Sequence, residues 1–405
     1  MFTLFFSLFS FFFFLVVFLV VFLVVFLISF QLEQSLGTQR SEQQKYALIG
    51  VCRDLRGIFS AALGSHSYGL LFDVIYPKHM RPLTTAAEIW GDTPEVMNPL
   101  LKFYTEFVNT KGMRIKFAPS SPNGILLFRE ISTVVVSYGN TLLRRQKPAD
   151  PTQEYSHWYK GMSLILNVMS QTLSGNYVNF GVFELYQDNS FTASLTVSLQ
   201  ILLSMQLKDI MAYPKVTKSY FQFLSVTFKY HLESLVKVDT NTFVKLIEAF
   251  REGLEVAPDN AIINLCAAAI DHLATFAFKT AMRGGQSSNA LRQHLSTVPT
   301  VFTTFFVMLL NNVMYRSMTS CWSISRPLLS LLLANEATVN EAQQQILRQQ
   351  PQPNHQRFQE AFNRMMADIK KTLETTNRDR FSQRVNMFRA EVKQFMVRPP
   401  QFDAV

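Results

Sequence analysis

Two short segments combine arginine with aspartate in a way that could bind an acidic partner. They are Cys52 to Gly57 (CRDLRG) and Asn377 to Phe381 (NRDRF). A guanidinium can hold a carboxylate through two parallel hydrogen bonds, so arginine clusters suit carboxylate-rich partners. The predicted partner-binding residues are Arg53, Arg56, Arg378, Arg380 and Arg384. The aspartates inside the same segments allow a structural alternative, in which local ion pairs tie one helical hairpin to the next.

The last basic segment also raises the question of nucleic-acid binding. Arg380 and Arg384 lie four residues apart, as do Arg389 and Lys393, so each pair shares one side of a helix. A nucleic-acid surface carries a dense basic stripe interleaved with exposed aromatic rings. The segment lacks such a stripe, so we expect no nucleic-acid partner.

The sequence lacks the motifs of common catalytic and nucleotide-binding sites. It contains no G-x-x-x-x-G-K-S/T, no G-x-G-x-x-G, no H-E-x-x-H and no G-x-S-x-G. His66 and His79 come nearest to a histidine pair, and the acidic residue between them is Asp73. Asp271 and His272 are adjacent, but neighbouring residues on a helix point about 100° apart, so a polar helix face is expected. We therefore predict no enzyme activity, no catalytic or metal site and no cofactor.

Composition and charge indicate a folded protein of a reducing compartment. Of the 405 residues, 48% are hydrophobic, which permits a large core and argues against disorder. The three cysteines, Cys52, Cys266 and Cys321, are too far apart for a C-x-x-C site and are expected to be buried apolar residues. The net charge of +9 favours acidic partners only in a general way, and a scattered solvated surface is the simpler interpretation.

The first thirty residues form an apolar run without a charge. The stretch from Leu4 to Phe30 exceeds the roughly 20 residues that cross a bilayer, so residues 1–30 would form a single membrane-spanning helix if translated. No basic residue precedes Arg40, so the run is not typical of a secretory signal. Residues 15–26 read LVVF three times, which is typical of translated simple-sequence DNA. We favour a gene-model artefact for 1–30, followed by a polar linker at 31–45, over a membrane anchor.

From residue 46 onward, apolar residues recur at helical spacing. Three stripes at steps of three and four are Leu48, Cys52, Leu55 and Phe59; Ile263, Cys266, Ile270 and Leu273; and Phe381, Val385, Phe388, Val392 and Phe395. Asp259 is placed to cap the second helix, and Thr376 and Asp379 have capping-box spacing before the third stripe. The pattern predicts amphipathic helices and few strands.

Helix starts and breaks follow one another along the chain. Ser121-Pro122 and Asp150-Pro151 each place a capping side chain before a proline that can take the first helical position. The segments 283–289 (RGGQSSN) and 348–354 (RQQPQPN) are the longest polar breaks and predict surface loops. Helices at about two per 40 residues predict an all-α fold of stacked HEAT-type hairpins, a helical solenoid.

Five stretches together resemble a known family. They are YALIGVCRDLRGI (46–58), SSPNGILLFREIS (120–132), SGNYVNFGVFELYQD (174–188), WSISRPLLSLLLANE (322–336) and NRDRFSQRVNMFRAEV (377–392). In this order and spacing they resemble the C-terminal part of the exportin-7 and Ran-binding protein 16/17 group of the importin-β superfamily. The resemblance runs from about residue 46 to the end, so residues 46–405 are expected to be a C-terminal HEAT-repeat region. One departure is Gln187, which stands before Asp188 where the family usually has glycine.

The resemblance implies a nuclear transport receptor. Members of the family bind Ran in its GTP state, carry protein cargo past nucleoporins and shuttle between nucleus and cytoplasm, without catalysis. No family contact residue carries over, because the Ran and cargo contacts of this part are not set by a motif. An array that starts at residue 46 begins within a solenoid, which is why a truncated gene model is expected to explain residues 1–30. The alternative function is a membrane-anchored helical-repeat scaffold at the endoplasmic reticulum or nuclear envelope.

Overall fold

Helices account for the regular structure of the chain. The computed structural model describes residues 40–256, 259–317 and 321–398, and these residues form helices and no β-strand. The predicted all-α fold of stacked hairpins is thus confirmed. The apolar segment 1–30 lies outside the described residues, as does most of the predicted linker. Two compact units divide the chain, one ending at Gln206 and the other beginning at Leu207.

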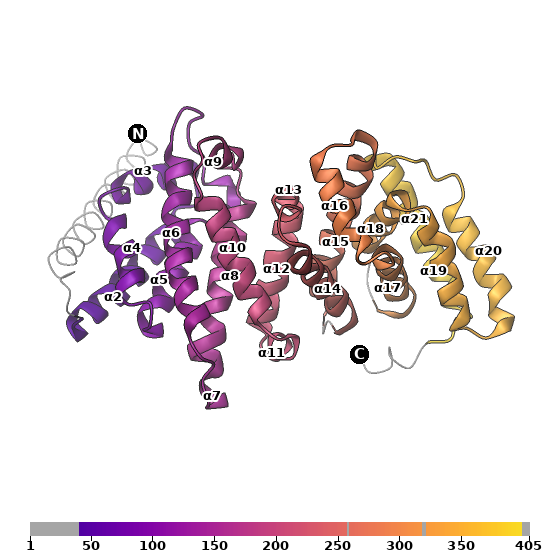
Figure 1. The fold of residues 1–405 in the computed structure, drawn as a ribbon, viewed down its shortest axis with the longest axis horizontal. Coiled ribbons are helices and arrows are strands. Elements are labelled where there is room, and N and C mark those ends of the chain that lie inside the picture. Colours follow the sequence, from indigo (N-terminus) through magenta and orange to yellow (C-terminus); the bar gives the residue numbers. More distant parts are fainter. Residues whose placement is uncertain (1–39, 257–258, 318–320, 399–405) are drawn as a thin grey trace, which may run out of the picture. The chain divides into compact units, whose positions relative to one another are not determined.

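The first unit consists of two neighbouring rows of helices (Figure 1). In one row α2 packs on α5 and α5 on α8, and in the other α4 packs on α6 and α6 on α10. Contacts of α4 with α5, and of α8 with both α6 and α10, join the two rows. The helices are α2 (Glu42–Ala61), α3 (Ser65–Ile75), α4 (Met80–Ile89), α5 (Pro94–Phe107), α6 (Asn123–Arg144), α7 (Pro151–Glu154), α8 (Lys160–Ser174), α9 (Gly181–Leu185) and α10 (Ser190–Ser204), with a 3₁₀ turn at Lys111–Met113 and a π-helical turn at Tyr155–Tyr159.

The second unit repeats this two-row arrangement. Its helices are α11 (Leu207–Ala212), α12 (Pro214–Tyr230), α13 (Leu232–Leu235), α14 (Thr240–Val256), α15 (Asn260–Arg283), α16 (Gln286–Ser296), α17 (Val301–Tyr315), α18 (Trp322–Ala334), α19 (Ala337–Arg348), α20 (His355–Met366) and α21 (Thr375–Val392), with a 3₁₀ turn at Gln352–Asn354. Helices α12, α15, α18 and α21 pack in succession and are called layer I. Helices α14, α17, α19 and α20 form layer II and pair with layer I as α14 with α15, α17 with α18, and α20 with α21.

The apolar stripes expected from the sequence form the interfaces between helices. The stripe of α2 is buried from Leu48 to Phe59, and that of α15 from Ile263 to Leu273. The ring of Phe59 packs edge-on against Phe107 of α5, with 4.9 Å between ring centroids. All three cysteines are buried and unbridged. Each stripe faces other helices because an isolated amphipathic helix cannot shield its own apolar face.

Arg114 joins the carboxyl-terminal ends of two helices in the first unit. Its side chain is 3% exposed, and Nη1 donates to the carbonyl oxygens of Phe59 (2.5 Å) and Ala62 (3.3 Å) at the end of α2. Nε donates to the Asn109 carbonyl at 2.7 Å, just after α5, and Nη2 donates to the Glu106 carboxylate at 2.8 Å. The last carbonyls of a helix lack intrahelical donors, so this one guanidinium satisfies acceptors that would otherwise be buried alone.

Several helix starts agree with the sequence. The Asp259 Oδ1 accepts from the backbone N–H groups of Ala261 (2.9 Å) and Ile262 (3.0 Å), and Asp150 caps α7 in the same way through Thr152. Helix α2 begins at Glu42, inside the segment expected as linker, because Ser41 and Gln44 form a capping box. Ser121 accepts from the N–H of residue 123, but Pro122 precedes α6 instead of starting it.

Three local expectations are wrong. Helix α21 starts at Thr375 with Glu374 as its cap residue, so Thr376 lies inside the helix and forms no capping box. The third stripe leaves the helix before Phe395, since α21 ends at Val392. The predicted loop at 283–289 shrinks to Gly284 and Gly285, both with positive φ. Residues 286–289 are instead helical, because α16 continues into a buried leucine and a buried histidine that anchor it.

Gln187, which stands where the resemblance implies a glycine, occupies a turn that favours glycine. Gln187 has a φ of 55°, in the left-handed region where a side chain is strained and glycine is not. The turn follows α9 and brings the Asp188 carboxylate to the N–H of Ser190, at 2.8 Å, at the start of α10. Backbone geometry at this turn therefore favours the glycine that the resemblance implies before the aspartate.

One described helix, α15, is long and apolar enough to cross a membrane by length and composition, and the bent pair α16 and α17 would make a second if counted as one span. The apolar side chains of α15 from Ile262 to Ala274 are buried within the second unit. Its hydropathy is therefore accounted for by packing between α12, α14 and α18.

Candidate interaction surface on layer I

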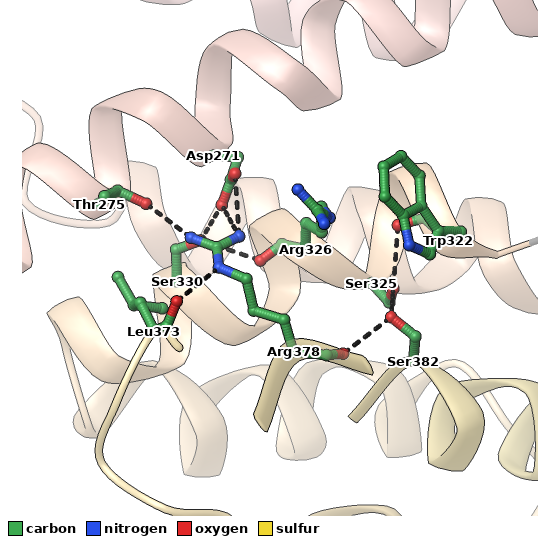
Figure 2. Close-up of polar contacts among 9 residues, drawn as sticks. All are labelled: Asp271, Thr275, Trp322, Ser325, Arg326, Ser330, Leu373, Arg378 and Ser382. Carbon is green, nitrogen blue, oxygen red and sulfur yellow. Dashed lines mark hydrogen bonds and ion pairs between the residues drawn. The ribbon is translucent and has the colours of Figure 1, made fainter. Parts of the chain in front are cut away.

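A buried ion pair links the first and third of three successive layer I helices (Figure 2). Arg378 of α21 reaches past α18 to Asp271 of α15, and its Nη1 donates to the two carboxylate oxygens at 2.9 and 3.0 Å. The two side chains are 10% and 13% exposed. Nη2 donates to Thr275 Oγ1 at 3.1 Å, and Nε donates to the Leu373 carbonyl at 3.2 Å. The Arg378 side chain thus donates these hydrogen bonds to groups within the protein.

Two serines of α18 join the intervening helix to the same cluster. Ser330 Oγ donates to the Asp271 carboxylate, and Ser325 Oγ lies 2.6 Å from Ser382 Oγ of α21. Both serines of α18 are completely buried. In a helical array each repeat normally contacts only its neighbours. Here the polar cluster ties α15, α18 and α21 together as a group of three, which fixes how these helices are set against one another.

An aromatic and cationic pair lies on the exposed side of α18. Trp322 is 49% exposed, and the Arg326 guanidinium carbon lies 4.0 Å from the centre of its ring. The Nε of Arg326 is buried and has no hydrogen-bond partner among the described residues. A guanidinium this close to an indole ring gains a cation–π attraction, which holds the two side chains together.

The five predicted partner-binding arginines lie in different environments. Arg53 and Arg56 are exposed on α2 and form no ion pair with another described residue, and Arg380 on α21 is likewise exposed. Arg384 makes a long contact of 3.4 Å with Asp368. Arg378 shows the structural role that the sequence left as the alternative. Partner binding by these residues stays a prediction; Arg53 and Arg56 belong to the first unit and the α21 arginines to the second.

The expectation that Asp271 and His272 form a simple polar helix face is wrong for Asp271. This carboxylate is the buried centre of the cluster, and its partner lies 107 residues away in the sequence. No local pattern could identify this ion pair, since the neighbouring sequence shows only an aspartate on a predicted helix. The one signal available was an acidic residue in the middle of an otherwise apolar helix, which needs a buried partner.

The pKa of His272 depends on its burial and on the charges around this cluster. Burial lowers its pKa, Lys229, Arg378 and Lys279 lower it further, and Asp271 opposes them. When the folded pKa of a base is depressed, the unfolded chain binds the proton first as the pH falls. The stability contribution of His272 is therefore complete above its usual pKa of 6.5 and is lost as the pH falls toward the folded value.

We expect the free energy of unfolding to decrease as the pH falls below about 6.5, the reference pKa of histidine. Urea denaturation at a series of pH values measures this decrease, and His272→Gln is expected to make it shallower. A variant with the same pH dependence as the parent protein would contradict the assignment to this residue.

A group of side chains that could bind a metal ion is one kind of site to consider in the described part of the chain. The described ranges contain no group of three or more His, Cys, Asp or Glu side chains that could hold a metal ion. A cavity of about 620 Å³ opens between α11, α12 and the start of α15, beside Lys218, Gln222 and Asn264. Its one acidic side chain, Asp259, already caps α15.

Comparison with known proteins identifies relatives of the chain. No family model matches it. It is 35% identical over 368 residues to Exportin-7-B of Xenopus laevis, covering 88% of this chain and 33% of that protein. It is 33% identical over 363 residues to Ran-binding protein 17 of Homo sapiens, and 30% identical over 365 residues to Ran-binding protein 16 of Drosophila melanogaster, covering 87% of the chain and 33% of each relative. The chain therefore spans about one third of the length of these relatives.

Proposed function

Because this chain is a homologue of the exportin-7 and Ran-binding protein 16/17 group, we propose that it is part of a nuclear transport receptor. The receptor carries protein cargo through nuclear pores, contacts nucleoporins on the way, and shuttles between nucleus and cytoplasm. Residues 46–405 act as its C-terminal HEAT-repeat region. The observation that carries this proposal is the similarity over 88% of the chain to proteins named as exportins.

The architecture supports a role that depends on shape and contact. Stacked hairpins bury their apolar stripes against neighbouring hairpins, so the helix faces left over form a long surface that can contact a whole protein. Side chains from several helices contribute to such a surface, and no single pocket is needed. A protein that binds through such a surface needs no catalytic motif, which agrees with the absence of the motifs named above from the sequence.

Coupling to Ran would give the receptor its direction. A ligand can shift the equilibrium of a flexible receptor only through a difference in its affinity for the two states. In the proposed cycle, Ran in its GTP state and the cargo favour the same closed arrangement of the repeats. Hydrolysis of the GTP on Ran removes that coupling, and the cargo is released.

Binding of Ran in its two nucleotide states tests the proposal. The receptor is expressed at its full natural length and titrated with Ran carrying a non-hydrolysable GTP analogue, and in parallel with Ran carrying GDP. We expect tighter binding of the GTP form, because only that form favours the closed arrangement. Equal affinity for both forms, or no binding of either, would overturn the proposal.

A further inference from the structure

The two layers of the second unit differ in charge. The helices of layer I contain ten lysines and arginines but only three acidic residues, Asp271, Asp379 and Glu391. The helices of layer II contain five basic and five acidic residues. The two layers belong to the same unit and contain four helices each, so the number of helices does not account for the difference in charge. The excess positive charge of the unit is concentrated on one layer.

Two of the three acidic residues of layer I are already paired. Asp271 is bound by Arg378, and Glu391 pairs with Arg364 of α20 in layer II, whereas Asp379 is exposed on α21. Helices α12, α15 and α18 contain no acidic residue besides Asp271, and their exposed Lys229 and Lys279 have no ion pair with any described residue. Cations gathered on these three helices repel one another, and an acidic partner relieves that repulsion.

Three neighbouring layer I helices carry cations at their surface. Lys218 and Lys229 on α12 and Lys279 on α15 are exposed, and Arg326 on α18 is half-buried. We call these four residues the basic face. Lys218 and Lys229 are eleven residues apart on α12, about three helical turns, so they share one side of that helix, and His272 and Lys279, seven residues apart, share one side of α15. Lys229 and Lys279 also lower the pKa of His272, in addition to its burial.

An exposed aromatic ring accompanies the basic face on α12 and another on α18. Tyr230 is 46% exposed with the Lys229 ammonium 4.7 Å from its ring centre, and Trp322 is 49% exposed with Arg326 above it. Aromatic residues and arginine are enriched at the centres of protein interfaces. In each case a cation lies over one face of the ring.

We propose that the basic face binds an acidic segment of a partner protein, with the rings of Tyr230 and Trp322 as apolar anchors. Carboxylates of the partner pair with the lysines and with the guanidinium of Arg326. The inference rests on the proposed function, since a transport receptor must hold a protein partner, and it specifies the chemistry of that partner. The cavity beside Lys218 lies between two of the same helices, α12 and α15.

A synthetic oligoglutamate peptide with a fluorescent label serves as the probe. Its binding to the intact chain is followed by fluorescence anisotropy, in the absence of Ran, at rising salt concentration. We expect binding that weakens with salt and a roughly tenfold lower affinity for the double variant Lys229→Glu/Lys279→Glu, because surface charge pairs are screened and reversal makes them repulsive. Trp322→Ala is expected to weaken the binding of an oligoglutamate peptide that also contains leucines.

The matched control is Lys245→Glu/Arg348→Glu, which changes the net charge equally but on exposed positions of layer II. It is expected to bind like the parent chain, and circular dichroism checks that both double variants are folded. Equal weakening by the two double variants would show an effect of net charge alone and overturn the proposal. Tighter binding of a single-stranded oligonucleotide of the same charge, lost in the same layer I variant, would also overturn it. If the oligoglutamate peptide does not bind but GTP-bound Ran does, the basic face is rejected as a binding site and the proposed transport function is retained.

Discussion

Replacing Arg378 by methionine is expected to lower the free energy of unfolding by about 3 kcal/mol, because it leaves the buried Asp271 carboxylate without its cation. The guanidinium supplies two hydrogen bonds to that carboxylate and one each to Thr275 and the Leu373 carbonyl. Methionine preserves much of the packing volume but none of these donors. Urea denaturation followed by circular dichroism measures the loss.

Two further variants separate the ion pair from packing. Arg380→Met, on the same helix but exposed, is expected to change the free energy of unfolding by less than about 0.5 kcal/mol. The double variant Asp271→Leu/Arg378→Met removes both charges and is expected to recover most of the stability, because an apolar pair carries no desolvation penalty. If Arg378→Met unfolded at the same urea concentration as the parent protein, the pair would not hold α15 to α21.

Replacing Arg114 by methionine is expected to destabilise the first unit by a similar amount, about 3 kcal/mol, because buried acceptors lose their donors. The affected groups are the Phe59 and Ala62 carbonyls at the end of α2 and the Asn109 carbonyl and Glu106 carboxylate at the end of α5. Hydrogen exchange at the last turns of α2 and α5 should accelerate together, which a purely local effect would not produce.

Arg114→Lys tests the geometry of this cap. Lysine keeps the charge but cannot reach acceptors on two helices with a planar fork, so an intermediate loss of stability is expected. Lys111→Met, at an exposed residue three positions away, is the control and should leave stability within about 0.5 kcal/mol of the parent. Full stability in Arg114→Lys would show that charge alone is needed and that the shared cap is unimportant.

These two arginines have different consequences for the proposed receptor. Arg114 fixes two helix ends within one pair of neighbouring helices, so its role is local. Arg378 connects helices that are not adjacent in layer I and therefore limits how far α21 can move relative to α15. A receptor that closes around a partner depends on such limits, because they decide which interfaces can shift.

The sequence alone determined the elements and their buried sides. Leu48, Cys52, Leu55 and Phe59 recur at helical spacing, and all four are buried on α2. The cap at Asp259 was equally readable, because a capping side chain acts on backbone groups two or three residues away. The errors at Thr376 and at 283–289 are also local, since the signals there fitted two structures and packing selected one.

The roles of the charged residues were decided by the tertiary structure. Arg378 and Arg380 stand two residues apart in the same motif, yet one is buried against Asp271 and the other is exposed. Likewise, the charge difference between layers I and II exists only once the hairpins are stacked and their helices sorted into rows. The physical reason is the distance along the sequence over which each interaction acts. Helical periodicity and capping act over a few residues, whereas an ion pair or a charged face depends on residues that only folding brings together.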